Sequence, residues 1–164
     1  MENIFHRISV RKYQDRPVEK EKIIQILRAG MQAPSACNQQ PWEFYVVTDK
    51  EKIKELSMAT RYSGCAAGAP VVIVPVYRKN GLVVPEMAQI DLSIALENIW
   101  LETDTLGLGG VWIGIAPFQD RMDAVKQMLQ LPDDVEVFSL FALGYPAEAR
   151  PQQDRFDENR IHFI

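Results

Sequence analysis

The sequence predicts a single domain of the α+β or layered α/β class. Helical and strand patterns alternate along the 164 residues, and no internal repeat or linker divides them. Residues 71–77 are continuously apolar, which is typical of a strand buried on both faces. Residues 86–106 carry the longest helical pattern of the chain. We therefore expect residues 1–164 to form one domain with a substantial hydrophobic core.

The first predicted helix begins near Pro17, whose missing N–H needs no partner in the first turn of a helix. Glu19 and Glu21 favour the same turn, because negative charge is stabilised at a helix N-terminus. Gly30 lies on the apolar face, where it would either let a neighbouring element approach closely or loosen the helix near its end. The other residues of that face, at helical spacing, are Ile23, Ile24, Leu27 and Met31.

Two strands and a second helix are expected next. Residues 44–48 are aromatic or β-branched and predict a buried strand. Residues 48–51 have the spacing of a capping box, so a helix should follow through about residue 58. Residues 62–70 are mostly small and predict a flexible connection to the apolar strand. Within that strand Pro75 indicates a bulge or the strand's end, because proline has no N–H to donate to a sheet.

The helix predicted over residues 86–106 is apolar around most of its circumference. We therefore expect it to be covered on most sides, in part by another subunit. Gly107, Gly109 and Gly110 predict the end of this helix and a tight turn into a strand over residues 111–115. They do not form a dinucleotide-binding motif, because that motif runs from a strand into a helix.

A short helix and a last strand complete the pattern. Residues 119–130 predict the helix, and Pro132 stops it. Residues 135–146 predict one strand closed by a turn. The tail from residue 147 is polar, with basic patches.

Composition places the chain among ordinary globular proteins, at 47% hydrophobic and 24% charged residues. A net charge of −4 gives no electrostatic footprint for nucleic acid or an anionic membrane. No apolar run approaches the roughly 20 residues that span a bilayer, and the first residues lack a signal-peptide pattern. Cys37 and Cys65 do not make a disulfide framework, so inert thiols are expected, with a redox pair as the alternative. We expect a cytoplasmic protein that binds neither nucleic acid nor a membrane.

The sequence does not indicate catalytic groups of the protein's own. His6 and His162 stand near opposite ends of the chain, and no Cys/His cluster has the spacing of metal ligands. Neither a nucleophile elbow nor a P-loop occurs. We therefore expect no metal and no catalytic side chain, and we assign the difficult step of any reaction to a bound organic cofactor.

The N-terminal segment carries a candidate anion clamp. In an extended backbone Arg7, Ser9 and Arg11 project to the same side. Two guanidinium groups flanking a hydroxyl suit a phosphate, since arginine pairs with phosphate through two hydrogen bonds. A solvated basic terminus is the alternative interpretation.

A second candidate segment, residues 33–42, follows the first helix. Pro34 ends that helix, and the stretch holds no full charge. Ser35, Asn38 and Gln40 offer neutral donors and acceptors from a stiff, non-helical backbone. This pattern suits a ligand with many carbonyl and ring-nitrogen edges, and it equally suits a polar connector between a helix and a strand.

Four segments, residues 7–11, 33–42, 106–114 and 142–146, together resemble the nitroreductase-like flavoproteins, FMN-dependent enzymes that work as homodimers. The pattern R-x-S-x-R combined with P-S-x-x-N-x-Q-P-W carries most of the resemblance. The resemblance covers nearly the whole chain. It implies a nitroreductase-like fold, with a central, mostly antiparallel sheet flanked by helices in an intertwined homodimer, and an FMN site at the subunit interface.

The resemblance also implies which residues hold the phosphate end of FMN. Arg7, Ser9 and Arg11 would bind the ribityl phosphate and the pyrimidine edge of the flavin. Arg155 falls where family members place a C-terminal arginine on the phosphate.

The same resemblance assigns the second segment to the flavin ring. Pro34, Ser35 and Ala36 would approach the flavin from the partner subunit, with Asn38 and Gln40 nearby.

The strand after the glycines completes the implied site, with Trp112 and Ile113 beside the isoalloxazine. One departure concerns residues 60–71, where nothing matches the Asn and Lys that larger members bring to the flavin. Arg61 is a candidate replacement for part of that charge.

By resemblance, electrons would pass from NADH or NADPH through FMN to a small electron-poor acceptor such as a nitroaromatic or a quinone, in a ping-pong mechanism. Two alternatives remain open. One keeps the flavin and changes the reaction, for example to reductive dehalogenation. The other is a flavin-binding module without turnover, for storage, sensing or regulation.

Overall fold

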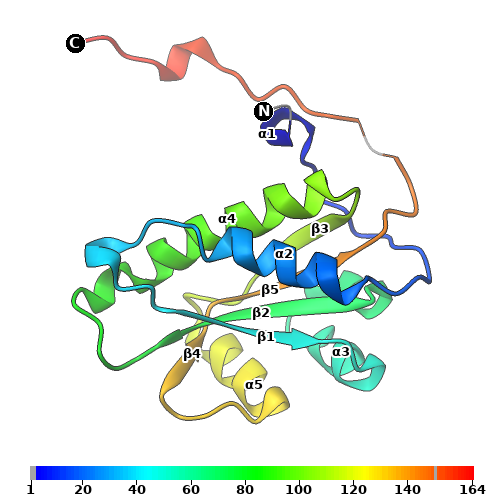
Figure 1. The fold of residues 1–164 in the computed structure, drawn as a ribbon, viewed down its shortest axis with the longest axis horizontal. Coiled ribbons are helices and arrows are strands. Elements are labelled where there is room, and N and C mark those ends of the chain that lie inside the picture. Colours follow the sequence, from blue (N-terminus) through cyan, green and yellow to red (C-terminus); the bar gives the residue numbers. More distant parts are fainter. Residues whose placement is uncertain (1–2, 150) are drawn as a thin grey trace.

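The structure is a computed structural model, and it describes residues 3–149 and 151–164. A five-stranded antiparallel sheet lies at the centre of these residues (Figure 1). The strand order is β1-β2-β5-β3, and β4 pairs with the C-terminal end of β2. The strands are β1 Trp42–Val47, β2 Val71–Arg78, β3 Gly109–Gly114, β4 Val135–Val137 and β5 Ser139–Gly144.

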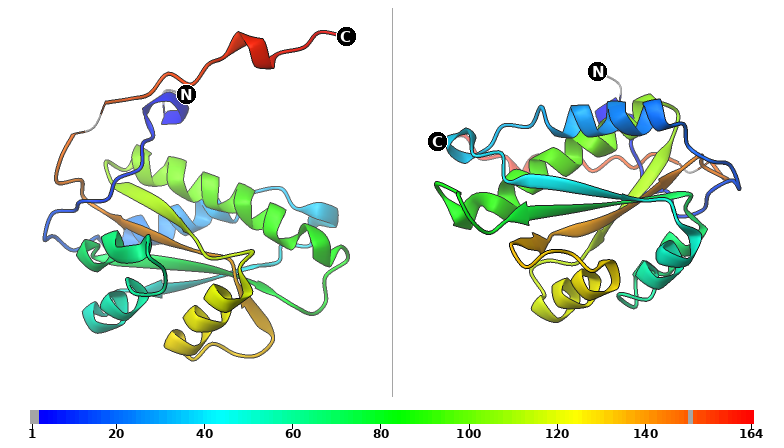
Figure 2. Two further views of the ribbon diagram at one scale, coloured as in Figure 1. Left: turned by 180° about the vertical axis from the view of Figure 1, so that it is seen from behind. Right: turned by 60° about the horizontal axis from the view of Figure 1, so that its bottom comes forward.

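Helices cover both faces of the sheet, α2 and α4 on one face and α3 and α5 on the other (Figures 1 and 2). The α-helices are α1 Asn3–His6, α2 Lys20–Gly30, α3 Lys50–Leu56, α4 Ala88–Thr105 and α5 Gln119–Leu129. Short 3-10 helices are η1 Ala36–Asn38, η2 Ser63–Gly68, η3 Pro85–Met87 and η4 Glu158–Arg160. This arrangement confirms the layered α+β class and the antiparallel sheet.

Strand β2 supplies both halves of the core, because its side chains alternate between the two faces of the sheet. Val72 and Val74 pack in the cluster under α3 and α5. Val71 and Ile73 pack in the cluster under α2 and α4. All four are at most 1% exposed, so the prediction of a strand buried on both faces is confirmed.

The chain continues through Pro75 without ending β2, and the predicted strand over residues 135–146 is instead two strands separated at Phe138. The carbonyl of Pro75 accepts a hydrogen bond of 2.9 Å from the Phe138 N–H. The N–H and C=O of one strand residue point to the same side, so the missing N–H of Pro75 faces the break between β4 and β5. Proline therefore interrupts the neighbouring strand and not its own.

The buried face of α2 differs from the predicted one. Ile24 and Met31 are 48% and 50% exposed, whereas Ile26 is fully buried. The helix turns a face at i, i+3 and i+7 toward α4, which brings Ile23, Ile26 and Gly30 inward. An added Cβ at Gly30 would lie 2.7 Å from the side chain of Ile99, so the predicted close approach is confirmed.

Strand β1 lies at an edge of the sheet, so the prediction of a buried strand over residues 44–48 is wrong for most of its side chains. Only Trp42 within β1 is fully buried, and Phe44, Tyr45 and Val47 are partly buried against the two core clusters at the rim of the sheet. The following helix α3 ends at Leu56, and Asp49 caps it by accepting a hydrogen bond from the Lys52 N–H.

Helix α4 ends as predicted, with Gly107 in the left-handed conformation at φ 72°. Its inner face is fully covered, and Ile90 and Ile94 on its outer face are 50% and 38% exposed. Beyond residue 150 the chain leaves the domain as an extended arm that holds η4 (Figures 1 and 2). No helix among the described residues is long and apolar enough to cross a membrane.

Candidate functional site

The N-terminal segment lies against strand β3. Ser9 forms an isolated parallel bridge with Gly110, and the Val10 N–H donates to the Gly110 carbonyl at 2.9 Å. Side chains at Gly109 or Gly110 would overlap Val10 or the ring of Phe141. The two glycines therefore allow close packing on both sides of β3, including the contact with the segment that carries Arg7, Ser9 and Arg11.

A hollow of about 350 Å³ opens at the C-terminal half of β3. Three predicted site residues line this β3 hollow, Arg11 from the N-terminal segment and Trp112 and Ile113 from the strand. The remaining lining residues were not predicted, and they are Tyr62, Cys65, Val111, Gly114 and Arg121. Tyr62 and Cys65 belong to the stretch that lacks a match to larger family members, so this chain fills that wall with an aromatic ring and a thiol.

Arg7 points toward α4. Its guanidinium lies 4.1 Å from the centre of the Trp100 ring and 3.4 Å from a Glu97 carboxylate oxygen, and its side chain is 17% exposed. A cation over an indole face is stabilised by the ring quadrupole, which fixes the direction of the guanidinium. An anion bound at Arg7 has to share it with Glu97.

The second predicted segment is anchored to the start of α4. Asp91, only 2% exposed, accepts hydrogen bonds from the Ala36 N–H at 2.9 Å and from Gln39 Nε2 at 2.7 Å. Gln39 also exchanges two hydrogen bonds of 3.0 Å with the backbone of Val84. A buried carboxylate is tolerated when donors satisfy it, and here both donors come from the loop over residues 34–40.

The 34–40 loop has a defined backbone. Cys37, Asn38 and Gln40 all have positive φ, between 44° and 52°, a conformation that non-glycine residues seldom adopt. The Ser35 hydroxyl accepts from the Gln40 N–H at 3.0 Å, and Gln40 Nε2 donates to the Asn38 side chain at 3.0 Å. Arg78 donates to the carbonyls of residues 39 and 40 at 3.2 and 3.0 Å. Several positive-φ residues held by such bonds are typical of a binding loop, where neighbouring contacts maintain strain.

Within one chain the loop and the N-terminal segment lie at opposite ends of α4 (Figure 1). Asp91 holds the loop in the first turn of the helix, and Asp104 binds His6 at 2.8 Å in its last turn. Thirteen residues separate these positions, which at about 1.5 Å per residue is roughly 20 Å. The structure therefore brings Arg11, Trp112 and Ile113 together at the β3 hollow, and no residue of the 34–40 loop lines this hollow.

Arg155 lies in the exposed C-terminal arm, where it donates to Gln153 at 2.8 Å. No contact of the described residues joins it to Arg7, Ser9 or Arg11. Its assignment to a phosphate stays a prediction.

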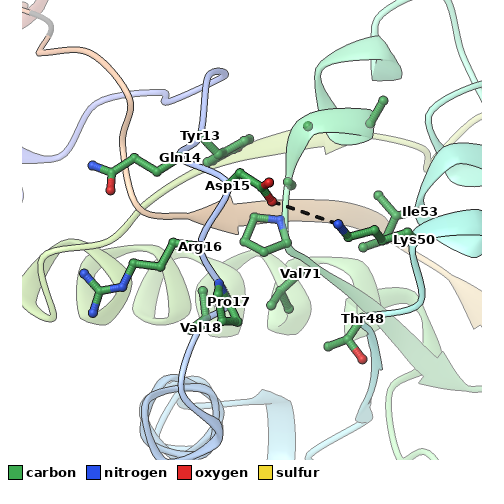
Figure 3. A pocket seen from close by; sticks show the side chains of 14 residues that line it. Tyr13, Gln14, Asp15, Arg16, Pro17, Val18, Thr48, Lys50, Ile53 and Val71 are labelled. Atoms are coloured by element: carbon green, nitrogen blue, oxygen red, sulfur yellow. Dashed lines mark ion pairs between the residues drawn. The ribbon is translucent and has the colours of Figure 1, made fainter.

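A cavity of about 640 Å³, larger than the β3 hollow, lies between residues 13–18 and the start of β2 (Figure 3). Asp15 and Lys50 face each other across it at 4.0 Å, and Arg16 points away onto the ring of Tyr145. Both partners of the ion pair are almost fully exposed, so water screens it strongly. The cavity contains none of the predicted site residues, and the β3 hollow is the better candidate.

Sequence reasoning missed Asp91, Gln39, Arg78 and Arg121. Asp91 had a detectable signal, because a carboxylate stood at core spacing between Ala88 and Ala95 on an otherwise apolar face. Arg78 and Arg121 had none, since an arginine at the end of a strand or in a helix is ordinary surface chemistry until its neighbours are known.

Comparison with known proteins gives one family. The model described as "Nitroreductase family" matches residues 4–63 and 57–145. A protein of Methanothermobacter thermautotrophicus, provisionally named NADH dehydrogenase/NAD(P)H nitroreductase, is 40% identical over 162 residues, which are 99% of this chain and 85% of the relative.

Solved structures agree. A provisionally named NADH oxidase of Clostridium acetobutylicum superposes with a TM-score of 0.95 and 43% identity, covering 98% of this chain and 97% of that one. An FMN-dependent nitroreductase of Clostridium difficile superposes with a TM-score of 0.91 and 32% identity, covering 98% and 96%.

Proposed function

Because this chain belongs to the nitroreductase family, we propose that it is an FMN-dependent NAD(P)H oxidoreductase that reduces a small electron-poor acceptor. Nitroaromatics and quinones are the proposed acceptors, in a ping-pong mechanism. The observation that carries the proposal is the β3 hollow, where Arg11 lies beside Trp112 and Ile113 of the strand. We also propose that the whole chain acts as one FMN-binding domain.

The donor set around the hollow fits a flavin. FMN has a doubly charged phosphate, a pyrimidine edge of carbonyl and N–H groups, and an apolar ring system. The N-terminal segment supplies cations and a hydroxyl, the 34–40 loop supplies neutral amides, and β3 supplies indole and aliphatic walls. An added Cβ at Gly114 would meet open space, so a flat ligand can approach the backbone there.

We assign each end of the cofactor to residues of this chain. Arg7 and Ser9 hold the phosphate, with Arg155 as a further cation from the arm. Arg11 binds the pyrimidine edge, and Trp112 and Ile113 exclude water from the ring. The cost of sharing Arg7 with Glu97 is small, because the carboxylate is 47% exposed and free to turn into solvent.

The 34–40 loop completes the site from a partner chain. Roughly 20 Å along α4 separate the loop's anchor at Asp91 from His6 at Asp104, and no residue of the loop lines the β3 hollow of its own chain. Apolar side chains that a second copy could cover stand exposed in α1, in α4 and in the arm, and they are Ile4, Phe5, Ile90, Ile94, Phe156, Ile161, Phe163 and Ile164. We therefore propose a homodimer in which Pro34, Ser35 and Ala36 face the flavin of the other subunit, with Asn38 and Gln40 beside them.

Bound FMN supplies two-electron chemistry, so the protein needs no acid or base of its own. Conversion of a nitro group to a nitroso group takes two electrons and two protons and releases water. NAD(P)H contributes a hydride, and solvent contributes the second proton. The side chains around the hollow bind and orient the two substrates in turn, which is why the proposed kinetics are ping-pong.

Anaerobic stopped-flow mixing with NADH and NADPH tests the proposal. Purified protein should carry FMN, and the flavin absorbance should bleach far faster than that of free FMN, then recover on addition of a nitroaromatic or a quinone. Protein that takes up no FMN would refute flavin dependence. Bound FMN that is reduced no faster than free FMN would indicate a binding module without turnover.

The proposed dimer has its own test. The protein should sediment as a dimer, and FMN should bind with lower affinity when the 34–40 loop is altered on the partner. A monomer that still binds FMN with native affinity would contradict the shared site.

A further inference from the structure

The β3 hollow contains a second cation that the flavin assignments leave unused. Arg11 and Arg121 are the two basic residues that line it, and the described lining includes no carboxylate. Arg11 comes from the N-terminal segment, whereas Arg121 comes from the first turn of α5 on the other side of the hollow. Among the described residues no acidic side chain forms an ion pair with Arg121.

Two contacts orient the side chain of Arg121. Its guanidinium lies 4.1 Å from the centre of the Phe118 ring, and its Nη1 lies 3.5 Å from the Gly114 carbonyl oxygen. Stacking on a ring leaves the edges of the guanidinium plane free to bind an anion. A planar guanidinium of this kind can bind a carboxylate through two parallel hydrogen bonds.

Arg121 lies well away from the phosphate end of the site. Ser9 bridges Gly110, and Arg121 lies against Gly114, four residues further along β3. At about 3.3 Å per residue this is roughly 13 Å. The two positions therefore serve different chemical groups.

We propose that Arg121 binds an acidic group on the electron acceptor, so that the protein prefers aromatic acids to their neutral analogues. This inference rests on the proposed function and names its substrate class. In the proposed function the flavin takes up part of the β3 hollow of about 350 Å³, so the room left beside Arg121 suits a small, single-ring acid. Tyr62 and Trp112 supply ring surfaces, and Arg121 supplies the charge at the edge.

Titration calorimetry on the FMN-loaded protein tests the binding step. Benzoate and benzamide are the two ligands, because neither has a nitro group that the protein could reduce during the titration. Arg121→Gln should weaken benzoate binding by roughly 10- to 100-fold and leave benzamide unchanged, the loss expected for one charge-assisted contact. Arg121→Lys should recover part of the benzoate affinity, because it keeps the charge and loses the two-pronged geometry. Arg28→Gln is the matched control, since it removes the same charge from α2 on the opposite face of the sheet.

Turnover gives the second readout. The ratio of kcat/KM for 4-nitrobenzoate to that for 4-nitrobenzamide should fall by a similar factor in Arg121→Gln and stay constant in Arg28→Gln. Unchanged benzoate affinity would overturn the inference. Loss of bound FMN in Arg121→Gln would also overturn it, because Arg121 would then bind the cofactor. A raised KM for NADPH alone would do the same, because Arg121 would then bind the 2′-phosphate of the electron donor. If wild-type protein reduces neither nitro compound, the proposed function fails, while the benzoate titration still reports on Arg121.

Discussion

Asp91 holds the 34–40 loop, and replacing it should loosen the loop without removing α4. The side chain is buried and accepts one hydrogen bond from the Ala36 N–H and one from Gln39 Nε2. Asp91→Asn keeps the size of the side chain but replaces one carboxylate oxygen by an NH₂ group. That group then faces an N–H donor of the loop and cannot accept its hydrogen bond. A hydrogen bond to a charged group contributes about 1.5–3 kcal/mol, so the free energy of unfolding should fall by about that much.

Asp91→Ala leaves both donors without the carboxylate. Two hydrogen bonds to a charged group set an upper limit of about 6 kcal/mol on the loss in the free energy of unfolding. The measured loss should be smaller, because both donors are only partly buried and regain water as the loop opens. Urea denaturation gives the loss directly, and FMN titration of the same variants should show weaker binding. The reason is that the loop would be less well ordered where the proposed dimer places it against FMN.

Ser93→Ala is the control for the Asp91 variants. Ser93 lies two residues away in α4, and its hydroxyl donates only to the Gln89 carbonyl within the helix. Its substitution should change stability by less than about 0.5 kcal/mol. If Asp91→Asn proves as stable as the Ser93→Ala protein, the carboxylate does not hold the loop and the reasoning is wrong.

Three further outcomes are expected. Arg11→Ala should weaken FMN binding by about 1.5–3 kcal/mol in a fluorescence titration. Unchanged affinity would show that Arg11 belongs to a solvated basic terminus and does not bind FMN. Gly110→Ala should lower the free energy of unfolding by about 1–3 kcal/mol, because the new methyl group overlaps the Phe141 ring; a fully stable variant would show that the ring moves freely. Burial favours the neutral phenol and raises the pKa of Tyr13 above its ordinary value of 10. The contribution of Tyr13 to the stability of the folded protein is therefore complete below pH 10, and it is lost as the pH rises further. Tyr13→Phe should therefore decline less steeply in urea stability between about pH 10 and 11 than the wild type, and equal slopes would contradict that origin.

Much of the fold was predictable because its signals are local. The apolar run of β2 predicts burial on both faces, and Gly30 predicts a close helix contact; both are confirmed. The split between β4 and β5 was not predictable from residues 135–146 alone. It depends on Pro75, which faces that break from a strand some 60 residues earlier in the chain.

The candidate site divides in the same way. Arg11, Trp112 and Ile113 were predictable from two short motifs, and the structure brings them to one hollow. Arg121 was not predictable, because its part in the hollow depends on how α5 packs beside the end of β3. Ile24 was predicted to be buried and is exposed, whereas Ile26 is buried. The cause is similar, since periodicity alone does not say which side of a short helix meets α4.

The separation of the 34–40 loop from the β3 hollow has a genetic consequence. In a two-fold dimer each subunit would lend its loop to one site and its hollow to the other. A chain altered at Asp91 and a chain altered at Arg11 would each, when alone, bind FMN weakly at both of their sites. Mixed, they would form heterodimers in which both lesions fall on one site and the other site is wholly native. Co-expression should therefore restore about one site in four, an intragenic complementation that no monomeric enzyme can display.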